Sequence, residues 1–130
     1  MKKIIPFLLS LLLLAGCASP AAHEASYRQI GMEEAIEIME NESDYIILDV
    51  RTAQEFSEKR IPGAINVPNE SIGTEEISEL PDKDQLILVY CRSGNRSKQA
   101  SEKLVKLGYT NIVEFGGIND WPGETISDMQ

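Results

Sequence analysis

Histidine is almost absent from this chain, since His23 is the only one among 130 residues. Cysteine is also scarce, with only Cys17 and Cys91. A cysteine–histidine dyad therefore has no candidate histidine in the folded part of the chain, because His23 lies in a short polar stretch near the N-terminus. A zinc site would need carboxylates and a single thiol, so we expect no metal centre.

Positive charge and long apolar runs are also limited. The chain carries 12 basic and 21 acidic residues, a formal charge of −9. This excess of acidic residues argues against a nucleic-acid-binding protein. The most apolar segment, residues 4–14, has 11 residues, whereas a membrane-spanning helix needs about 20.

The N-terminus has the organisation of a secretory signal. Lys2 and Lys3 precede the apolar segment, and "LAGC" at 14–17 resembles the lipobox of bacterial lipoproteins. We predict a lipoprotein signal peptide over 1–16, and Cys17 as a lipidated N-terminus followed by a tether to residue 26. Cleavage leaves 10 basic against 21 acidic residues, a charge of −11, so the anchor and not charge must hold the protein at an anionic membrane. The expected location is the bacterial cell envelope, outside the cytoplasm.

Strand and helix patterns alternate along the rest of the chain. Apolar runs predict strands at 45–50, 64–67, 86–91 and 111–115. Helical spacing of apolar residues predicts helices at 32–43 and 97–107, and "TEEISEL" at 74–80 predicts one or two helical turns. Thr52 and Glu55 have the spacing of a capping box at the start of a short helix. Alternating elements favour an α/β fold with a mostly parallel sheet and helices on both faces.

Cys91 ends the most apolar of these strands, and sites in parallel sheets form beyond the carboxyl ends of the strands. The segment "CRSGNRS" that follows contains a glycine, two arginines and the start of a helix. Its backbone amides and the positive helix end would both stabilise an anion there, and we predict a lowered pKa for Cys91. The alternative is that Cys91 is an inert core residue.

Four segments occur in the order and spacing of a single-domain rhodanese-like protein: "LDVRTAQEF", "RIPGAINVP", "VYCRSGNRS" and "GGINDW". The resemblance covers residues 27 to about 124 and leaves 125–130 as a C-terminal tail. It implies a five-stranded, mostly parallel sheet flanked by helices, and sulfur transfer without a cofactor. The implied partners are a small sulfur-containing anion and a thiol or protein acceptor. We expect a monomer.

The resemblance assigns Cys91 as the nucleophile that carries the sulfur. The following residues would supply amides and charge around the sulfur and bind the donor: Arg92, Ser93, Gly94, Asn95, Arg96 and Ser97. Asp49 and Arg51 match a supporting segment of the family, and we expect Arg51 to pair with Glu55 beneath the loop. Arg60 stands where the family usually has histidine, and Trp121 with the two glycines at 116–117 is expected to serve the core.

Three other functions stay open. A rhodanese-like domain can dock a partner without chemistry, although the cysteine at position 91 argues against this. A phosphatase or arsenate reductase is a second alternative, since these enzymes share the fold. Cysteine phosphatases place their arginine six residues after the cysteine, whereas Arg96 is five residues after Cys91. The third possibility is redox cycling of Cys91 through sulfenic acid.

Overall fold

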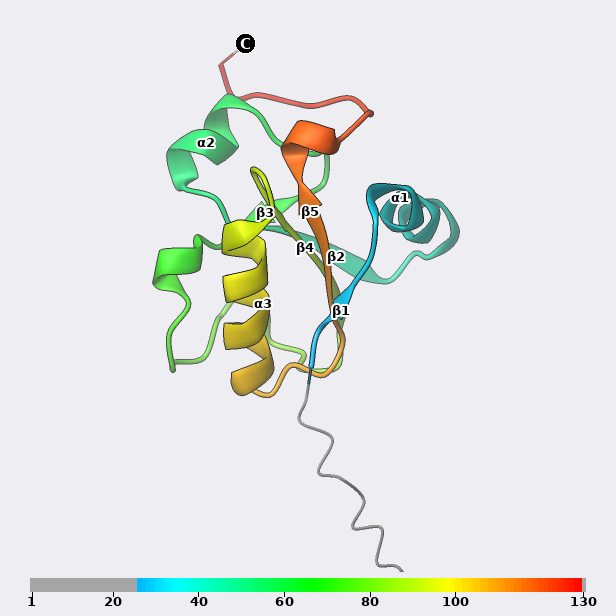
Figure 1. Ribbon diagram of the computed structural model, residues 1–130. Coiled ribbons are helices and arrows are strands. Elements are labelled where there is room, and N and C mark those ends of the chain that lie inside the picture. Colours follow the sequence, from blue (N-terminus) through cyan, green and yellow to red (C-terminus); the bar gives the residue numbers. More distant parts are fainter. Residues whose placement is uncertain (1–25, 130) are drawn as a thin grey trace, which may run out of the picture.

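Five strands form one sheet in which every neighbouring pair is parallel, in the order β1-β5-β4-β2-β3 (Figure 1). The computed structural model describes residues 26–129. The strands are β1 (Arg28–Gln29), β2 (Tyr45–Asp49), β3 (Ile65–Asn66), β4 (Leu86–Cys91) and β5 (Ile112–Gly117). The helices are α1 (Met32–Asn41), α2 (Ala53–Glu58) and α3 (Asn95–Lys106), with short 3-10 turns at Asn69–Ser71 and Ile118–Asp120. The predicted α/β class is confirmed.

The central strand β4 is buried on both faces, as its continuous apolar sequence "LILVYC" indicates. Its side chains alternate between two apolar clusters. Ile87, Val89 and Cys91 pack on one side, and Leu88 and Tyr90 pack on the other. This alternation places the Cys91 side chain on the face of the sheet that α3 covers.

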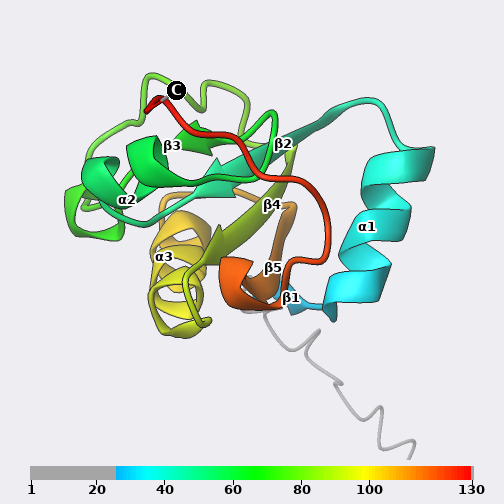
Figure 2. The same cartoon turned by 90° about the horizontal axis from the view of Figure 1, so that it is seen from above.

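One helix layer covers each face of the sheet (Figures 1 and 2). Ala100 and Leu104 of α3 are buried against the Cys91 side. Ala35 of α1 is buried against the opposite side, with Met32 and Met39 partly buried around it. In residues 26–129 no helix is both long and apolar enough to cross a membrane. The predicted signal peptide and Cys17 lie outside the described residues.

Three local predictions were incomplete or wrong. The edge strand β1 was not identified, because its two residues are exposed and show no apolar alternation. The segment 74–80 contains no helix, and its Ile77 and Leu80 instead fill the core from an irregular loop. α3 begins at Asn95, two residues before the predicted start, because the left-handed Gly94 already turns the chain into the helix.

A bulge in β5 interrupts the regular pairing of β4 and β5 next to Cys91. Val89 pairs with Glu114, but Cys91 pairs with Gly117, so β5 contains one residue more than β4 over this interval. Gly116 has a φ of 98°, which glycine adopts at no steric cost. The bulge therefore ends the regular pairing at the point where the Cys91 loop leaves the sheet.

Candidate active site

The loop between β4 and α3 is held by its glycine. Gly94 has a φ of 114° and is the residue before the first turn of α3. Cys91, at the end of β4, is 1% exposed, and Gly94 is buried beside it. Arg92, Ser93 and Asn95 are exposed, so the loop presents their side chains to solvent while its backbone surrounds the sulfur.

Two groups of the loop contact the Cys91 sulfur directly. The Gly94 N–H donates to Sγ at 3.0 Å, and the thiol donates to the Ser97 Oγ at 3.4 Å. Burial raises the pKa of Cys91, but hydrogen bonds from the Ser97 side chain and from the amides of Ser97, Gly94 and Ser93 outweigh it and lower the pKa below its usual value. The predicted direction is confirmed, and the largest causes that lower the pKa are hydrogen bonds. Ser97 lies within the first turn of α3, whose N-cap residue is Gly94.

Arg96 is held by α2. Its two terminal nitrogens donate to the two carboxylate oxygens of Glu55, at 2.6 and 3.0 Å. The predicted capping box with Thr52 is present and fixes Glu55 at the start of α2. The hydrogen bonds from Arg96 hold the pKa of Glu55 at about 2, despite some desolvation. This fork-to-fork pair ties the active loop to the neighbouring helix.

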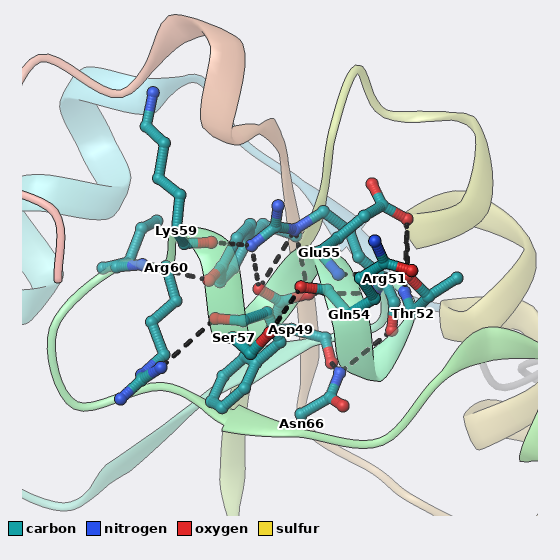
Figure 3. Close-up of polar contacts among 12 residues, drawn as sticks. Asp49, Arg51, Thr52, Gln54, Glu55, Ser57, Lys59, Arg60 and Asn66 are labelled. Carbon is teal, nitrogen blue, oxygen red and sulfur yellow. Dashed lines mark hydrogen bonds and ion pairs between the residues drawn. The ribbon is translucent and has the colours of Figure 1, made fainter. Parts of the chain in front are cut away.

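The expected pairing of Arg51 with Glu55 is wrong. Arg51 binds Asp49 instead, with a shortest N–O distance of 2.7 Å, and both side chains are buried (Figure 3). Arg51 also donates to the carbonyl of Lys59, and the Asn66 amide donates to the carbonyls of Asp49 and Arg51. Arg51 therefore joins the end of β2 to the end of α2, and the Asn66 side chain joins β3 to the same segment. α2 instead turns the Glu55 carboxylate towards Arg96 of α3.

A cleft of about 290 Å³ opens beside the loop. Its lining residues are Arg51, Glu55, Glu58, Lys59, Arg92, Ile118 and Asn119. Arg92 brings an exposed guanidinium to this cleft, whereas Arg96 is already paired. The Arg92 carbonyl accepts a hydrogen bond from the Asn119 N–H at 3.2 Å, which docks the loop on the segment after β5.

Glu114 is a site residue that sequence reasoning missed, and Gly117, which was expected to serve the core, also lies at the site. Glu114 is 3% exposed, and its carboxylate accepts a hydrogen bond from the Ser97 hydroxyl at 3.1 Å. A signal was present, because Glu114 lies two residues after Ile112 in a strand and must share its buried face. Gly117 lies directly against the loop, and a β-carbon there would stand 2.1 Å from the Arg92 carbonyl oxygen.

Arg60, the departure from the family pattern, holds the C-terminal segment. Its guanidinium pairs with Asp128 at 2.7 Å and stacks on the Phe56 ring at 4.6 Å. Its backbone exchanges hydrogen bonds with Ile126. Trp121 is partly buried against the apolar cluster on the α1 side of the sheet, in keeping with a core role.

Metal-binding groups do not gather anywhere in residues 26–129: no three side chains of histidine, cysteine, aspartate or glutamate are placed to hold an ion together. The expectation of cofactor-free chemistry stays a prediction. His23 lies outside the described residues.

Comparison with known families identifies two matches. The model of the rhodanese-like domain matches residues 32–124, and the prokaryotic membrane lipoprotein lipid attachment site matches residues 1–18. The first match covers most of the chain and includes four of the five strands, from β2 to β5, while the edge strand β1 precedes it.

Individual relatives agree with this assignment. The thiosulfate sulfurtransferase PspE of Escherichia coli is 36% identical over 73 residues, which cover 56% of this chain and 70% of PspE. A sulfurtransferase of Allochromatium vinosum is 35% identical over 94 residues, which cover 72% of this chain and 86% of that protein. A solved structure described as a rhodanese with anions from E. coli superimposes with a TM-score of 0.58 at 33% identity, covering 64% of this chain and 98% of that one.

Proposed function

The chain belongs to the rhodanese-like domain family and is a sulfurtransferase of that type, and we propose that it carries sulfane sulfur as a persulfide on Cys91. The observation that supports this most directly is the environment of the sulfur. A buried thiol lies at the carboxyl end of the central strand, with an amide N–H 3.0 Å from Sγ and the start of a helix beside it. These groups stabilise an anionic sulfur, which is the form that both a thiolate and a persulfide take.

The proposed reaction has two balanced steps. The Cys91 thiolate attacks the outer sulfur of a donor such as thiosulfate, an S–S bond forms to Sγ, and sulfite leaves with the electron pair of the broken bond. An acceptor thiolate or cyanide then attacks the terminal sulfur, and the electron pair of the Sγ–S bond returns to Cys91. Neither step needs an outside oxidant or reductant, so no cofactor is invoked.

Donor binding is assigned chiefly to Arg92. Its guanidinium is exposed at the cleft beside the loop, while the charge of Arg96 is satisfied by Glu55. We expect Arg92→Ala to raise the thiosulfate concentration needed for half-maximal loading roughly tenfold, because a charge-assisted contact to the donor is lost. The control is Arg28→Ala, which removes another exposed arginine, from β1 at the edge of the sheet. Equal loading curves for the two variants would assign donor binding elsewhere.

The test of sulfur transfer is intact mass in a Cys17→Ser background, where Cys91 is the only thiol. Thiosulfate should add one sulfur atom, and cyanide should remove it. Cys91→Ser should gain nothing under the same conditions. A folded protein that gains no sulfur would contradict persulfide chemistry, and turnover of a phosphate ester or arsenate would then support the phosphatase alternative.

We also propose that the mature protein is anchored to the bacterial envelope through lipid on Cys17, as the matched attachment site supports. The described chain enters the sheet at the amino end of β1, and Cys91 lies at the carboxyl end of the parallel strand β4 (Figure 1). Entry and active loop therefore lie at opposite ends of the sheet, which suits acceptors that approach from the aqueous side. Incorporation of labelled palmitate should be lost in Cys17→Ser, and retained label would contradict the anchor.

A further inference from the structure

Glu114 is an unusual buried charge. The buried charged side chains among residues 26–129 are Asp49, Arg51 and Glu114, and the first two neutralise each other. Glu114 forms no ion pair with any described residue. A buried carboxylate without a cation needs hydrogen bonds, and the groups that supply them here belong to the active loop and the bulge.

Three donors surround the Glu114 carboxylate. The Gly116 N–H donates to Oε2 at 2.6 Å, and the Ser97 hydroxyl donates to the same oxygen at 3.1 Å. The Gln29 amide of β1 reaches Oε1 at 3.4 Å. Because Ser97 lies in the first turn of α3, Glu114 also faces the positive end of that helix. The same helix end lies beside the Cys91 sulfur, so two potential anions share it.

The Ser97 hydroxyl has one proton and four acceptors within reach. They are the Gly94 carbonyl at 2.9 Å, the Glu114 carboxylate at 3.1 Å, the Gly116 carbonyl at 3.4 Å and the Cys91 sulfur at 3.4 Å. When Cys91 is a thiol, it can donate a hydrogen bond to the Ser97 oxygen, and the Ser97 hydroxyl can then donate to the Glu114 carboxylate. A Cys91 thiolate has no proton to donate and needs the one on Ser97.

We propose that Glu114 is a positioning residue that competes with the Cys91 sulfur for the hydroxyl proton of Ser97, and thereby keeps the thiol from ionising as readily as the loop alone would allow. Charge acts in the same direction. The contacts from Sγ to Oγ, 3.4 Å, and from Oγ to Oε2, 3.1 Å, place the two anions no more than about 6.5 Å apart. Like charges at this separation disfavour ionisation of the second group.

Other charged or titratable groups act on this pair from the elements packed around it. They are Arg96 with its partner Glu55 at the head of α3, Arg92 in the loop, Glu102 on α3, and Tyr27 before β1, whose pKa is raised by burial and by the charges of both Glu102 and Glu114. The Tyr90 side chain packs on the opposite face of the sheet, with the Arg51 guanidinium over its ring. None of these residues is itself replaced in Glu114→Gln. Replacement of Glu114 by glutamine therefore tests two properties of Glu114, its negative charge and its acceptance of the hydrogen bond from the Ser97 hydroxyl.

The test is the pH dependence of Cys91 alkylation by iodoacetamide in Glu114→Gln, in the Cys17→Ser background. Glutamine has the shape of glutamate, can still accept from Gly116, and can donate to Ser97. We expect the midpoint to fall by about one pKa unit, so alkylation below the midpoint becomes about tenfold faster. The matched control, Glu102→Gln, removes an exposed carboxylate from α3 and should leave the midpoint unchanged. A midpoint that is unchanged or higher in Glu114→Gln would overturn the proposal.

The role of the Ser97 hydroxyl is tested by repeating Glu114→Gln in the Ser97→Ala background. Without the hydroxyl there is no shared proton, so Glu114→Gln should shift the midpoint much less than it does when Ser97 is present. A shift of full size in that background would show that charge acts alone and would refute the competition. Alkylation requires no sulfur donor, so these results are independent of whether Cys91 carries sulfur.

A measurement on the native residues covers the case in which Glu114→Gln fails to fold. The carboxyl carbon of Glu114, observed by ¹³C NMR, should change its chemical shift with the same midpoint as Cys91 alkylation. Alkylation of Cys91 should abolish that step. A carboxyl signal that stays flat across the Cys91 midpoint would equally overturn the proposal.

Discussion

The close contact between β5 and the active loop makes Gly117→Ala an informative perturbation. A β-carbon at this position would stand 2.1 Å from the oxygen and 2.3 Å from the carbon of the Arg92 carbonyl, and 2.6 Å from the Ser93 nitrogen. All three atoms belong to the backbone, so no side-chain rotation relieves the clash. The φ of Gly117 is −141°, an extended value that alanine adopts freely. The effect of the substitution therefore comes from the contact and not from backbone strain.

The size of the effect follows from the distance. To restore even 3.0 Å the Arg92 carbonyl must retreat by about 1 Å, and its hydrogen bond from Asn119 must lengthen or break. Overpacking of this kind costs about 1–3 kcal/mol. The Gly94 amide follows in the same loop, so the cradle of the Cys91 sulfur moves as well. Misplacement of about 1 Å reduces rates by about a hundredfold.

Two assays separate these consequences. Urea unfolding should show a midpoint about 1 M lower in Gly117→Ala, and persulfide formation from thiosulfate should slow by about a hundredfold. The matched control is Gly73→Ala, where an added β-carbon meets no atom within 4 Å. If Gly117→Ala keeps both the wild-type midpoint and the wild-type rate, the loop does not rest on β5 as described and the reasoning fails.

Three further substitutions test the supporting contacts. Asp49→Ala leaves the buried Arg51 without its partner and should lower the free energy of unfolding, measured in urea, by about 3–5 kcal/mol. Asp128→Ala removes the exposed partner of Arg60 and should lower the free energy of unfolding by less than about 1 kcal/mol. A similar loss for both would contradict the buried pair. Glu55 has a lowered pKa, so its stabilisation is present above the unfolded value of 4.5 and is lost as pH falls towards 2. Glu55→Gln should therefore lower the melting temperature near neutral pH but not near pH 2, and a pH-independent difference would contradict the ion pair. Ser101 has the only buried side-chain oxygen without a hydrogen-bond partner among residues 26–129, so Ser101→Ala should raise the free energy of unfolding by up to about 1 kcal/mol. A clear loss of stability would show that the hydroxyl is satisfied.

Much of the fold could be predicted because its strands are buried on both faces. The runs "YIILD" and "LILVYC" are too apolar to lie at the surface, and the helical spacing in α1 is equally clear. The edge strand β1 could not be predicted in the same way. Its two exposed residues are a strand only because β5 offers them hydrogen-bond partners 85 positions away along the chain.

The residues of the site also fall into those that local sequence predicts and those that it does not. Cys91, the glycine of its loop and the helix that follows are adjacent in the sequence, so their arrangement follows from local conformation. The ion-pair partners of the arginines do not follow from local conformation. Arg51 and Arg96 each had several acidic residues within possible reach, and the choice between Asp49 and Glu55 depends on how α2 packs against α3.

The sequence by itself determined the class of fold, the position of the thiol at a strand end and the direction of its pKa shift, because these depend on apolar periodicity and on a few consecutive residues. Only the tertiary structure decided that Glu114 lies beneath Ser97, that Gly117 touches the loop and that Arg96 is already paired. Those contacts join residues from separate elements across a sheet. Their distances are set by strand register and by the bulge in β5, which no local pattern specifies.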